Sequence, residues 1–418
     1  MLRCLLLLMF SSLMISPCFA ESDTTSIYEE VESSVYQIRV INNETGKKVG
    51  IGSGFVVEKD DILATNYHVI SAYVNAPDVF SLEYLSTAGE SGPLTLLDLD
   101  VIHDLAVLRS KKPMGTPLKI AAIPEKGAKL YSLGNPLDLG FSIVPGTNNG
   151  IMTQDQDGNI LFSGSLNPGM SGGPTLDESG NIIGVNVATH GNSIGFLVPA
   201  NYLSIILDRL VKRNYFPVQD RFTRIAEQLI EKSQRTIDRL SQNDWGSTHI
   251  GKLVVPAELD KSMRCWDVSR TPKKDDLFRH FLTECSNQEN TYLSKNLSVG
   301  AISYEYIWMD TAKLHPLRFT IQYEKMNSSF IDIDVSKSDV TNFACHTEFL
   351  DVAGQNFKST VCRRDYLRYK GMSDMLFSIA LVGHEREGGL FNLDVTGTNA
   401  KAAFGLFKKM VETFKWQS

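Results

Sequence analysis

The stretch SLNPGMSGGPTL, residues 165–176, places glycine and proline on both sides of one serine, Ser171. Gly, Pro, Ser and Asn are the usual residues of tight turns, so the stretch alone is also typical of a turn without chemistry. A serine hydroxyl becomes a good nucleophile only when a base takes its proton and a third group orients that base. The chain must therefore also supply a histidine and a carboxylate.

Histidine and aspartate residues occur in two patterned stretches upstream of this serine. His68 stands in ILATNYHVIS, where a β-like run ends, and we expect its imidazole on the turn that follows. His103 stands in DLDVIHDLAVL, directly before an apolar run. A lone histidine in a turn is usually no base, so these positions alone do not decide the question. The acidic candidates near His103 are Asp98, Asp100 and Asp104.

Four motifs occur along the chain in a fixed order: TNYHV (65–69), HDLAVL (103–108), GNP (134–136) and NPGMSGGP (167–174). In this order they resemble the chymotrypsin-fold (trypsin-like) serine proteases of bacteria, closest to the HtrA/Deg group, over residues 34–212. The resemblance implies an all-β double barrel and a serine endopeptidase, a hydrolase acting on peptide bonds.

The resemblance also implies the role of each site residue. His68 is expected to be the base, Asp104 the carboxylate that orients it, and Ser171 the nucleophile. The amides of Gly169 and Ser171 are expected to form the oxyanion hole, because glycine lets the backbone turn sharply there. His103 is left without a catalytic role, as an ordinary strand residue.

The chain departs from the family in two places. Met170 stands directly before the nucleophile, where the chymotrypsin branch has Asp and the HtrA/Deg group often has Asn. It cannot pair with a new N-terminus, so we expect no activation by propeptide cleavage. A PDZ carboxylate-binding loop is not recognisable in the sequence after Pro217, so PDZ-driven regulation does not carry over.

Substrate preference is expected to depend on a pocket whose floor is formed by Ser165 and Leu166, ahead of the nucleophile. A preference for Lys or Arg would need a carboxylate there, and none is present. We therefore expect a small or medium apolar residue before the cleaved bond. His190 offers an alternative, a preference for Glu or Asp, as in glutamyl endopeptidases. Candidates for the opposite wall are Val187, Ala188, Phe196 and Leu197.

At 418 residues the chain is long enough for two or three domains. Residues 34–199 contain many short β-like runs separated by turn residues, which predict a barrel or sandwich. Helical spacing follows in 199–213. We expect a signal peptide at 1–20, a trypsin-like protease domain at 21–216, a connecting amphipathic helix at 217–244, and a disulfide-containing α+β domain at 245–418.

The third region is assigned to the α+β class from its mixed texture. AISYEYIWM (301–309), LRFTIQYE (317–324) and SFIDIDVS (329–336) are strand-like, and NAKAAFGLFKKMVETFKW (399–416) is expected to be a closing helix. The connecting helix is expected to bury one face, which is formed by Phe222, Ile225, Ala226, Leu229, Ile230, Ser233, Ile237 and Leu240.

The composition limits the partners of the protein. A formal net charge of −7 without a sustained basic run argues against nucleic acid and against docking on anionic membranes. The first twenty residues combine an early Arg, a short apolar run and Ala20, which is typical of a cleaved secretory signal. We expect a periplasmic or secreted protein with no membrane span after signal removal, and with protein or peptide substrates.

The mature chain would keep four cysteines, all in its second half: Cys265, Cys285, Cys345 and Cys362. An even number in an exported chain favours disulfides, with three possible pairings. Proximity favours Cys265 with Cys285 and Cys345 with Cys362, each stabilising by about 3 kcal/mol. Zinc is the competing interpretation, but no C-x-x-C pair is present. We expect neither a metal nor a cofactor.

Two other functions compete with an active peptidase. A catalytically silent binding or scaffold protein on a protease fold would usually lose a triad member, whereas this chain has all three candidates. An esterase could use the same three residues. The G-x-S-x-G spacing around Ser171 does not indicate an α/β-hydrolase, because the order here is His, Asp, Ser.

Overall fold

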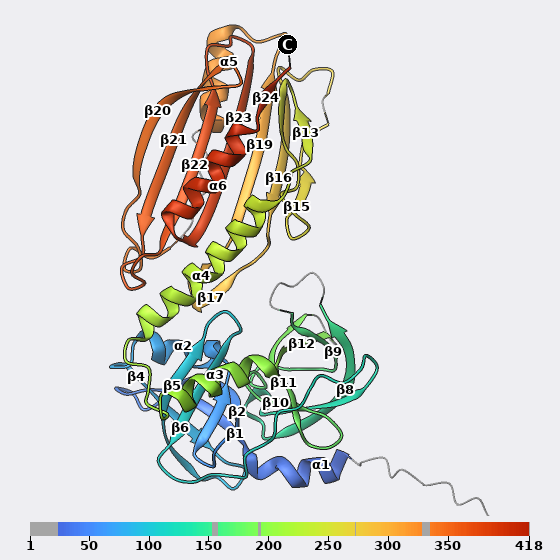
Figure 1. The fold of residues 1–418 in the computed structure, drawn as a ribbon, viewed down its shortest axis with the longest axis vertical. Coiled ribbons are helices and arrows are strands. Elements are labelled where there is room, and N and C mark those ends of the chain that lie inside the picture. Colours follow the sequence, from blue (N-terminus) through green and yellow to red (C-terminus); the bar gives the residue numbers. More distant parts are fainter. Residues whose placement is uncertain (1–23, 153–157, 191–193, 272, 328–334, 418) are drawn as a thin grey trace, which may run out of the picture.

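The protein has two parts joined by one long helix, α4 (Arg221–Gln242), in the computed structural model (Figure 1). The structure describes residues 24–152, 158–190, 194–271, 273–327 and 335–417, without the side chains of 188–190. The expected signal peptide lies outside these residues, as does most of the strand expected at 329–336.

The N-terminal part is built from two closed six-stranded barrels, which confirms the predicted chymotrypsin-like double barrel. Strand order is β1-β2-β3-β6-β5-β4 in the first and β10-β11-β12-β9-β8-β7 in the second. The bounds are β1 Val35–Asn42, β2 Lys48–Val56, β3 Ile62–Thr65, β4 Phe80–Leu85, β5 Ser91–Asp100, β6 Leu105–Ser110, β7 Lys129–Gly134, β8 Ser142–Ile151, β9 Ile160–Ser163, β10 Pro174–Leu176, β11 Ile182–His190 and β12 Ile194–Pro199.

Three helices flank the barrels: α1 (Thr24–Val31), α2 (Tyr67–Asn75) and α3 (Ala200–Lys212). One apolar core runs between the two barrels and includes Phe55 from the first and Tyr131 from the second, both fully buried. Helix α3 buries one side against this core, as the helical spacing predicts. The barrels are therefore fixed against each other, and so are the residues at their junction.

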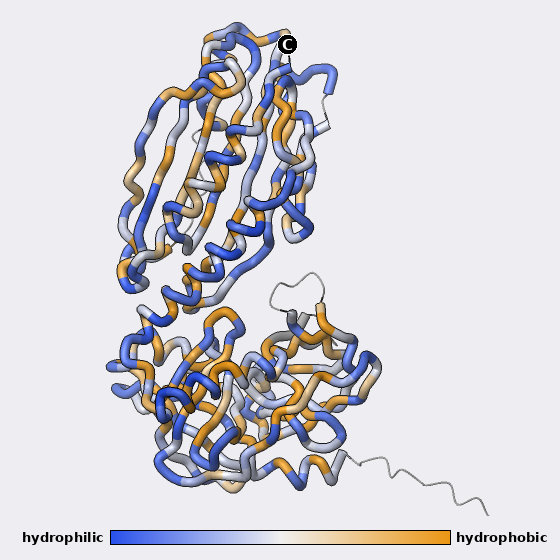
Figure 2. Tube along the Cα trace, viewed as in Figure 1, coloured by the Kyte–Doolittle hydropathy of each residue, from blue (hydrophilic) through white to orange (hydrophobic). Residues whose placement is uncertain are grey.

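The C-terminal part contains a seven-stranded antiparallel sheet with order β15-β16-β19-β23-β22-β21-β20, a three-stranded sheet β13-β14-β24 and a two-stranded sheet β17-β18. Helices α4 and α6 (Ala400–Glu412) lie on one face of the seven-stranded sheet, and hydrophilic residues follow the outer side of α4 (Figures 1 and 2). The strand bounds are β13 Ser247–Ile250, β14 Leu253–Pro256, β15 Arg264–Asp267, β16 Arg279–Ser286, β17 Thr291–Ser294, β18 Leu297–Val299, β19 Ile302–Asp310, β20 Ala344–Val352, β21 Gln355–Asp365, β22 Ser373–Leu381, β23 Glu387–Thr398 and β24 Lys415–Trp416.

One expected strand, LRFTIQYE, is in fact part of helix α5 (Pro316–Asn327). The helix begins at a proline, whose fixed φ suits the first helical position. Phe319, Tyr323 and Met326 then recur at helical spacing and pack on the sheet with buried Met309. The β-prone residues of this stretch are overridden by that packing.

Both edge strands of the seven-stranded sheet are joined to their neighbours by disulfides. Cys265 of β15 is bonded to Cys285 of β16, and Cys345 of β20 to Cys362 of β21. These are the pairs that proximity in the sequence favours. An edge strand has one row of unpaired backbone groups and is the easiest strand to detach. The disulfides therefore hold the sheet together at both of its margins.

Asp394 of β23 gives the C-terminal sheet an expected pH dependence. It is 7% exposed, and burial, reinforced by the charge of Glu305, raises its pKa from 3.8 to about 7. Between about pH 4 and 7 the unfolded chain releases this proton and the folded chain keeps it. Stability should therefore fall as pH rises through that window, by at most about 1.4 kcal/mol per pH unit.

Asp394→Asn should remove this slope and raise the urea midpoint more at pH 7.5 than at pH 5. All four tryptophans lie at or beyond residue 245, so their fluorescence follows unfolding of the C-terminal part alone. Asp275→Asn, at an exposed position of the same part, is the matched control. An unchanged slope in Asp394→Asn would contradict the assignment.

Candidate active site

Asp104 accepts hydrogen bonds from the first turn of the helix that carries His68, whose N-cap residue is Asn66. The carboxylate Oδ1 accepts a hydrogen bond from the His68 amide at 2.8 Å, and the Asp104 carbonyl accepts from the Tyr67 amide at 3.1 Å. Asn66 donates to the same carbonyl at 2.8 Å. Helix N-termini have free amides and favour negative charge, so the helix and the carboxylate stabilise each other.

We expected His68 on the turn that follows a β-run. It lies instead on the first turn of helix α2. Asp104 has a left-handed backbone conformation with φ +53°, which costs free energy for a residue with a side chain. The hydrogen bonds to Asn66, Tyr67 and His68 hold it there.

The second carboxylate oxygen of Asp104 contacts the imidazole directly. The distance from His68 Nδ1 to Asp104 Oδ2 is 2.6 Å, and the two side chains are 32% and 23% exposed. Burial alone would lower the pKa of His68, but the charge and hydrogen bond of Asp104 outweigh it, and the pKa is raised from 6.5. The pair also fixes which imidazole nitrogen faces away from the carboxylate.

Ser171 lies at the junction of the two barrels, close to the helix of His68. A Cβ added to Gly52 would lie 2.5 Å from Val69 and 3.0 Å from the Ser171 carbonyl, so these two residues meet across that glycine. The Ser171 Oγ donates to the Val187 carbonyl at 3.0 Å. Within the described residues no hydrogen bond joins this hydroxyl to His68.

The turn before Ser171 has a shape that only glycine permits. Gly169 has φ +97°, and a Cβ there would lie 2.3 Å from the Asn135 carbonyl oxygen. Among the described residues the amides of Gly169 and Ser171 find no acceptor, whereas the amide of Met170 between them donates to Asn167. Two amides next to a serine hydroxyl are thus left available for another acceptor.

Ser53 of β2 supports this turn, and sequence analysis did not single it out. Its hydroxyl donates to the Gly169 carbonyl at 2.7 Å and accepts from the Asn135 amide at 2.9 Å. Its amide donates to the Ser171 carbonyl at 2.7 Å. The only signal in the sequence is a serine between two glycines, GSG, in a strand, which carries no information about a partner more than a hundred residues away.

Met170 is fully buried and packs with Phe162, Leu166 and Leu197 in the core of the second barrel. Its side chain points into the protein. The methionine that distinguishes this chain from the family at this position therefore contributes to core packing.

The other acidic candidates have different partners. Asp98 is buried and forms ion pairs with Arg209 at 3.2 Å and Arg213 at 3.1 Å. Asp100 contacts the His103 ring at 2.9 Å; burial opposes ionisation, but this hydrogen bond prevails and lowers the pKa of Asp100. His103 lies in the turn between β5 and β6, not in a strand as expected, and stacks on Tyr202 at 3.6 Å.

The residues expected to form the specificity pocket are only partly brought together. Leu166 is buried and would contact a Cβ at Gly195 of β12 at 2.8 Å. Ser165 is exposed. His190 ends β11, and its side chain lies outside the described residues. Leu197, expected on the opposite wall, is buried in the core of the second barrel.

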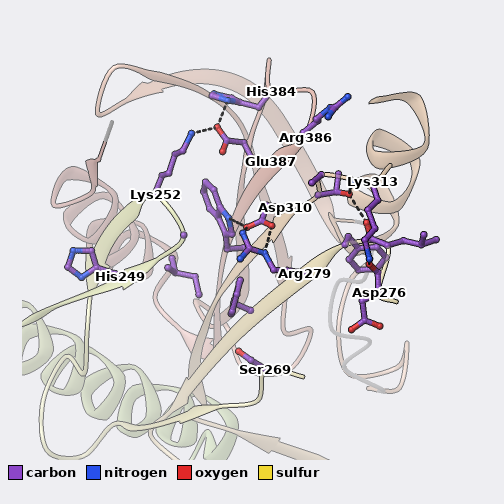
Figure 3. Close-up of a pocket in the computed structure, with 18 of the residues that line it drawn as sticks. His249, Lys252, Ser269, Asp276, Arg279, Asp310, Lys313, His384, Arg386 and Glu387 are labelled. Carbon is purple, nitrogen blue, oxygen red and sulfur yellow. Dashed lines mark hydrogen bonds and ion pairs between the residues drawn. The ribbon is translucent and has the colours of Figure 1, made fainter. Parts of the chain in front are cut away.

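A cavity of about 1240 Å³ lies in the C-terminal part (Figure 3). It is at the end of the sheet that lies away from the barrels (Figure 1). Four of its charged side chains form two ion pairs, Arg279 with Asp310 at 2.7 Å and Lys252 with Glu387 at 2.9 Å. We assign it no part in the chemistry at Ser171. In the described part of the chain, no three metal-ligating side chains cluster, and no helix is long and apolar enough to cross a membrane.

The double barrel, with a histidine–aspartate pair and a serine at the junction, is a chymotrypsin-like protease domain. Residues 52–185 match the trypsin-like peptidase domain family. The barrel part is similar to Protease Do-like 1, chloroplastic, of Arabidopsis thaliana, with 32% identity over 180 residues, covering 39% of this chain and 40% of that protein. The barrel part is thus similar to the protease domains of the HtrA/Deg group.

Two further relatives are serine proteases by name. The mitochondrial serine protease HTRA2 of Drosophila virilis is 31% identical over 172 residues, covering 39% of this chain and 40% of that protein. A probable periplasmic serine endoprotease, DegP-like, of Chlamydia pneumoniae is 30% identical over 173 residues, 38% of this chain and 34% of that protein. The solved structure of Deg5 shares 26% identity with a TM-score of 0.39, covering 45% and 93%. The chain spans less than half the length of these curated relatives.

The His68–Asp104 contact makes a prediction that does not depend on catalysis. Asp104→Asn removes the charge while the burial of the ring remains, so the pKa of His68 should fall below its wild-type value. Imidazole NMR titration of 15N-histidine-labelled protein measures it, with His68→Gln to assign the signal. Asp100→Asn is the matched control and should leave the pKa of His68 unchanged. An unchanged His68 pKa in Asp104→Asn would contradict the coupling.

Proposed function

We propose that the protein is an exported serine endopeptidase that hydrolyses peptide bonds with Ser171, His68 and Asp104. The supporting observation is the contact of 2.6 Å between the Asp104 carboxylate and the His68 imidazole. The helix that carries His68 meets the Ser171 turn across Gly52. The similarity to serine proteases of the HtrA/Deg group adds weight, because their names describe the same activity.

The proposed reaction starts with a rotation of the Ser171 hydroxyl from the Val187 carbonyl toward the imidazole. His68 takes its proton through Nε2 while Oγ attacks the substrate carbonyl, and Asp104 stabilises the imidazolium. The amides of Gly169 and Ser171 then bind the oxyanion. His68 passes the proton to the leaving amine. Water then attacks the acyl-enzyme while His68 takes its proton, and His68 returns this proton to Ser171 as the acid product leaves.

The proposal includes the organisation of the whole chain. Residues 21–216 would form the protease domain, 217–244 the connecting helix, and 245–418 a domain that regulates the protease or recruits substrate. Export to the periplasm or beyond is proposed from the signal-like segment 1–20, and a DegP-like relative is named periplasmic. The disulfides in the C-terminal part are compatible with an oxidising compartment.

Labelling of the full chain with a fluorophosphonate probe tests the nucleophile. The wild type should label, Ser171→Ala should not, and His68→Ala and Asp104→Asn should label at least about 10³-fold more slowly. The labelling rate should rise with pH through the pKa of His68, because only neutral imidazole accepts the proton. His103→Ala is the matched control. No labelling of the wild type would favour the silent scaffold.

The same protein should prefer a small or medium apolar residue before the cleaved bond. Leu166 is buried at the expected pocket, and neither it nor Ser165 supplies a carboxylate for Lys or Arg. A positional-scanning library of coumarin amides measures the preference. Dominant cleavage after Glu that is lost in His190→Ala would contradict the apolar preference and assign the specificity to His190.

A further inference from the structure

The hairpin β17–β18 leaves the C-terminal sheet and packs against helix α2 of the protease domain. Leu293 of this hairpin is fully buried in a core shared with the first barrel. Its carbonyl accepts hydrogen bonds from the Tyr67 hydroxyl at 2.8 Å and from the Asn75 side chain at 3.1 Å. The hairpin is thereby fixed to both ends of the helix that carries His68.

The opposite end of α2 is held from a second place in the C-terminal domain. Arg368 donates to the Asn75 carbonyl at 3.0 Å, and the Tyr369 hydroxyl lies 3.2 Å from Asn75 Oδ1. Tyr369 is buried in the same shared core as Leu293. Because two separate segments contact one helix, the domain cannot shift locally relative to His68 without breaking both contacts.

Tyr292 directly precedes Leu293, and it is partly exposed where Leu293 is fully buried. Its ring centroid lies 6.5 Å from that of His68, with the planes at 88°, and its hydroxyl lies 3.4 Å from Ser71 Oγ. The protein covers this residue only in part, since Tyr292 is 37% exposed. An exposed aromatic ring thus stands beside the imidazole proposed as the base.

A cavity of about 800 Å³ opens at this ring, between the two parts of the protein. On the protease side it is lined by His68, Asp104 and Val187, whose carbonyl holds Ser171 Oγ. On the other side it is lined by 287–292 and by residues around Lys261. The volume is in the range of ligand-binding clefts, so it accepts an extended segment of a few residues and excludes a folded domain.

We infer that Tyr292 is a substrate-contacting, specificity-determining residue that the C-terminal domain contributes to the peptidase cleft. The inference rests on the proposed function. The substrate is an extended polypeptide, and one of its apolar side chains near the cleaved bond packs on the Tyr292 ring. Val101, Ile102 and Met152 line the same cavity and supply further apolar surface for that side chain.

The first test needs no catalysis. p-Benzoylphenylalanine replaces Tyr292 in full-length Ser171→Ala protein, which is irradiated with β-casein, an unfolded protein that offers extended segments. Cross-links should form at position 292. The matched control is the same replacement at Phe349, which is 67% exposed on the outer strand β20. A yield at 292 no higher than at 349 would overturn the inference.

The second test separates substrate contact from an effect on His68. With the best apolar coumarin peptide, Tyr292→Ala should lose about tenfold in kcat/KM, about 1.4 kcal/mol, mainly through KM. Tyr292→Phe should recover most of it, and Phe349→Ala should behave as wild type. An equal loss in the fluorophosphonate labelling rate, or no loss at all, would refute substrate contact. Absent labelling of the wild type would refute the proposed function, while the cross-linking result would still stand.

Discussion

The hydrogen bond between the Asp104 carboxylate and the first turn of helix α2 is the constraint on which the site depends. One oxygen of this carboxylate accepts a hydrogen bond from the His68 amide, and the other contacts the His68 ring. The same group therefore sets the direction of the helix and the orientation of the imidazole. A movement of Asp104 would disturb both together, and its left-handed backbone is held by the residues that it orients.

The serine turn is held by a separate set of contacts from the first barrel. Ser53 binds the backbone on both sides of Met170, and Met170 itself is fixed in the core of the second barrel. The two barrels thus each contribute to the conformation in which the amides of Gly169 and Ser171 have no acceptor among the described residues. Preorganised donors of this kind need no rearrangement when charge develops on a substrate.

The C-terminal domain adds a second constraint on the same helix. Leu293 and Arg368 hold α2 from outside the barrels, while Asp104 holds its beginning from within. Any change in how the C-terminal domain docks would reach His68 through one short helix. The disulfides at both edges of the C-terminal sheet stabilise this part of the protein, because they prevent the outer strands of the sheet from detaching.

The sequence by itself predicted a β barrel or sandwich from its short apolar runs, and the helices α3 and α4 from helical spacing. The double barrel and the candidates His68, Asp104 and Ser171 followed from motifs that resemble those of the HtrA/Deg proteases. The strand predicted at LRFTIQYE was wrong. These β-prone residues form helix α5, because Phe319 and Tyr323 pack on the seven-stranded sheet. Only the tertiary structure decided that His68 begins a helix, that Ser53 supports the serine turn, and that Tyr292 stands beside the imidazole. Each of these depends on residues far apart in the chain, whose contacts arise from packing and leave no periodic signal in the sequence.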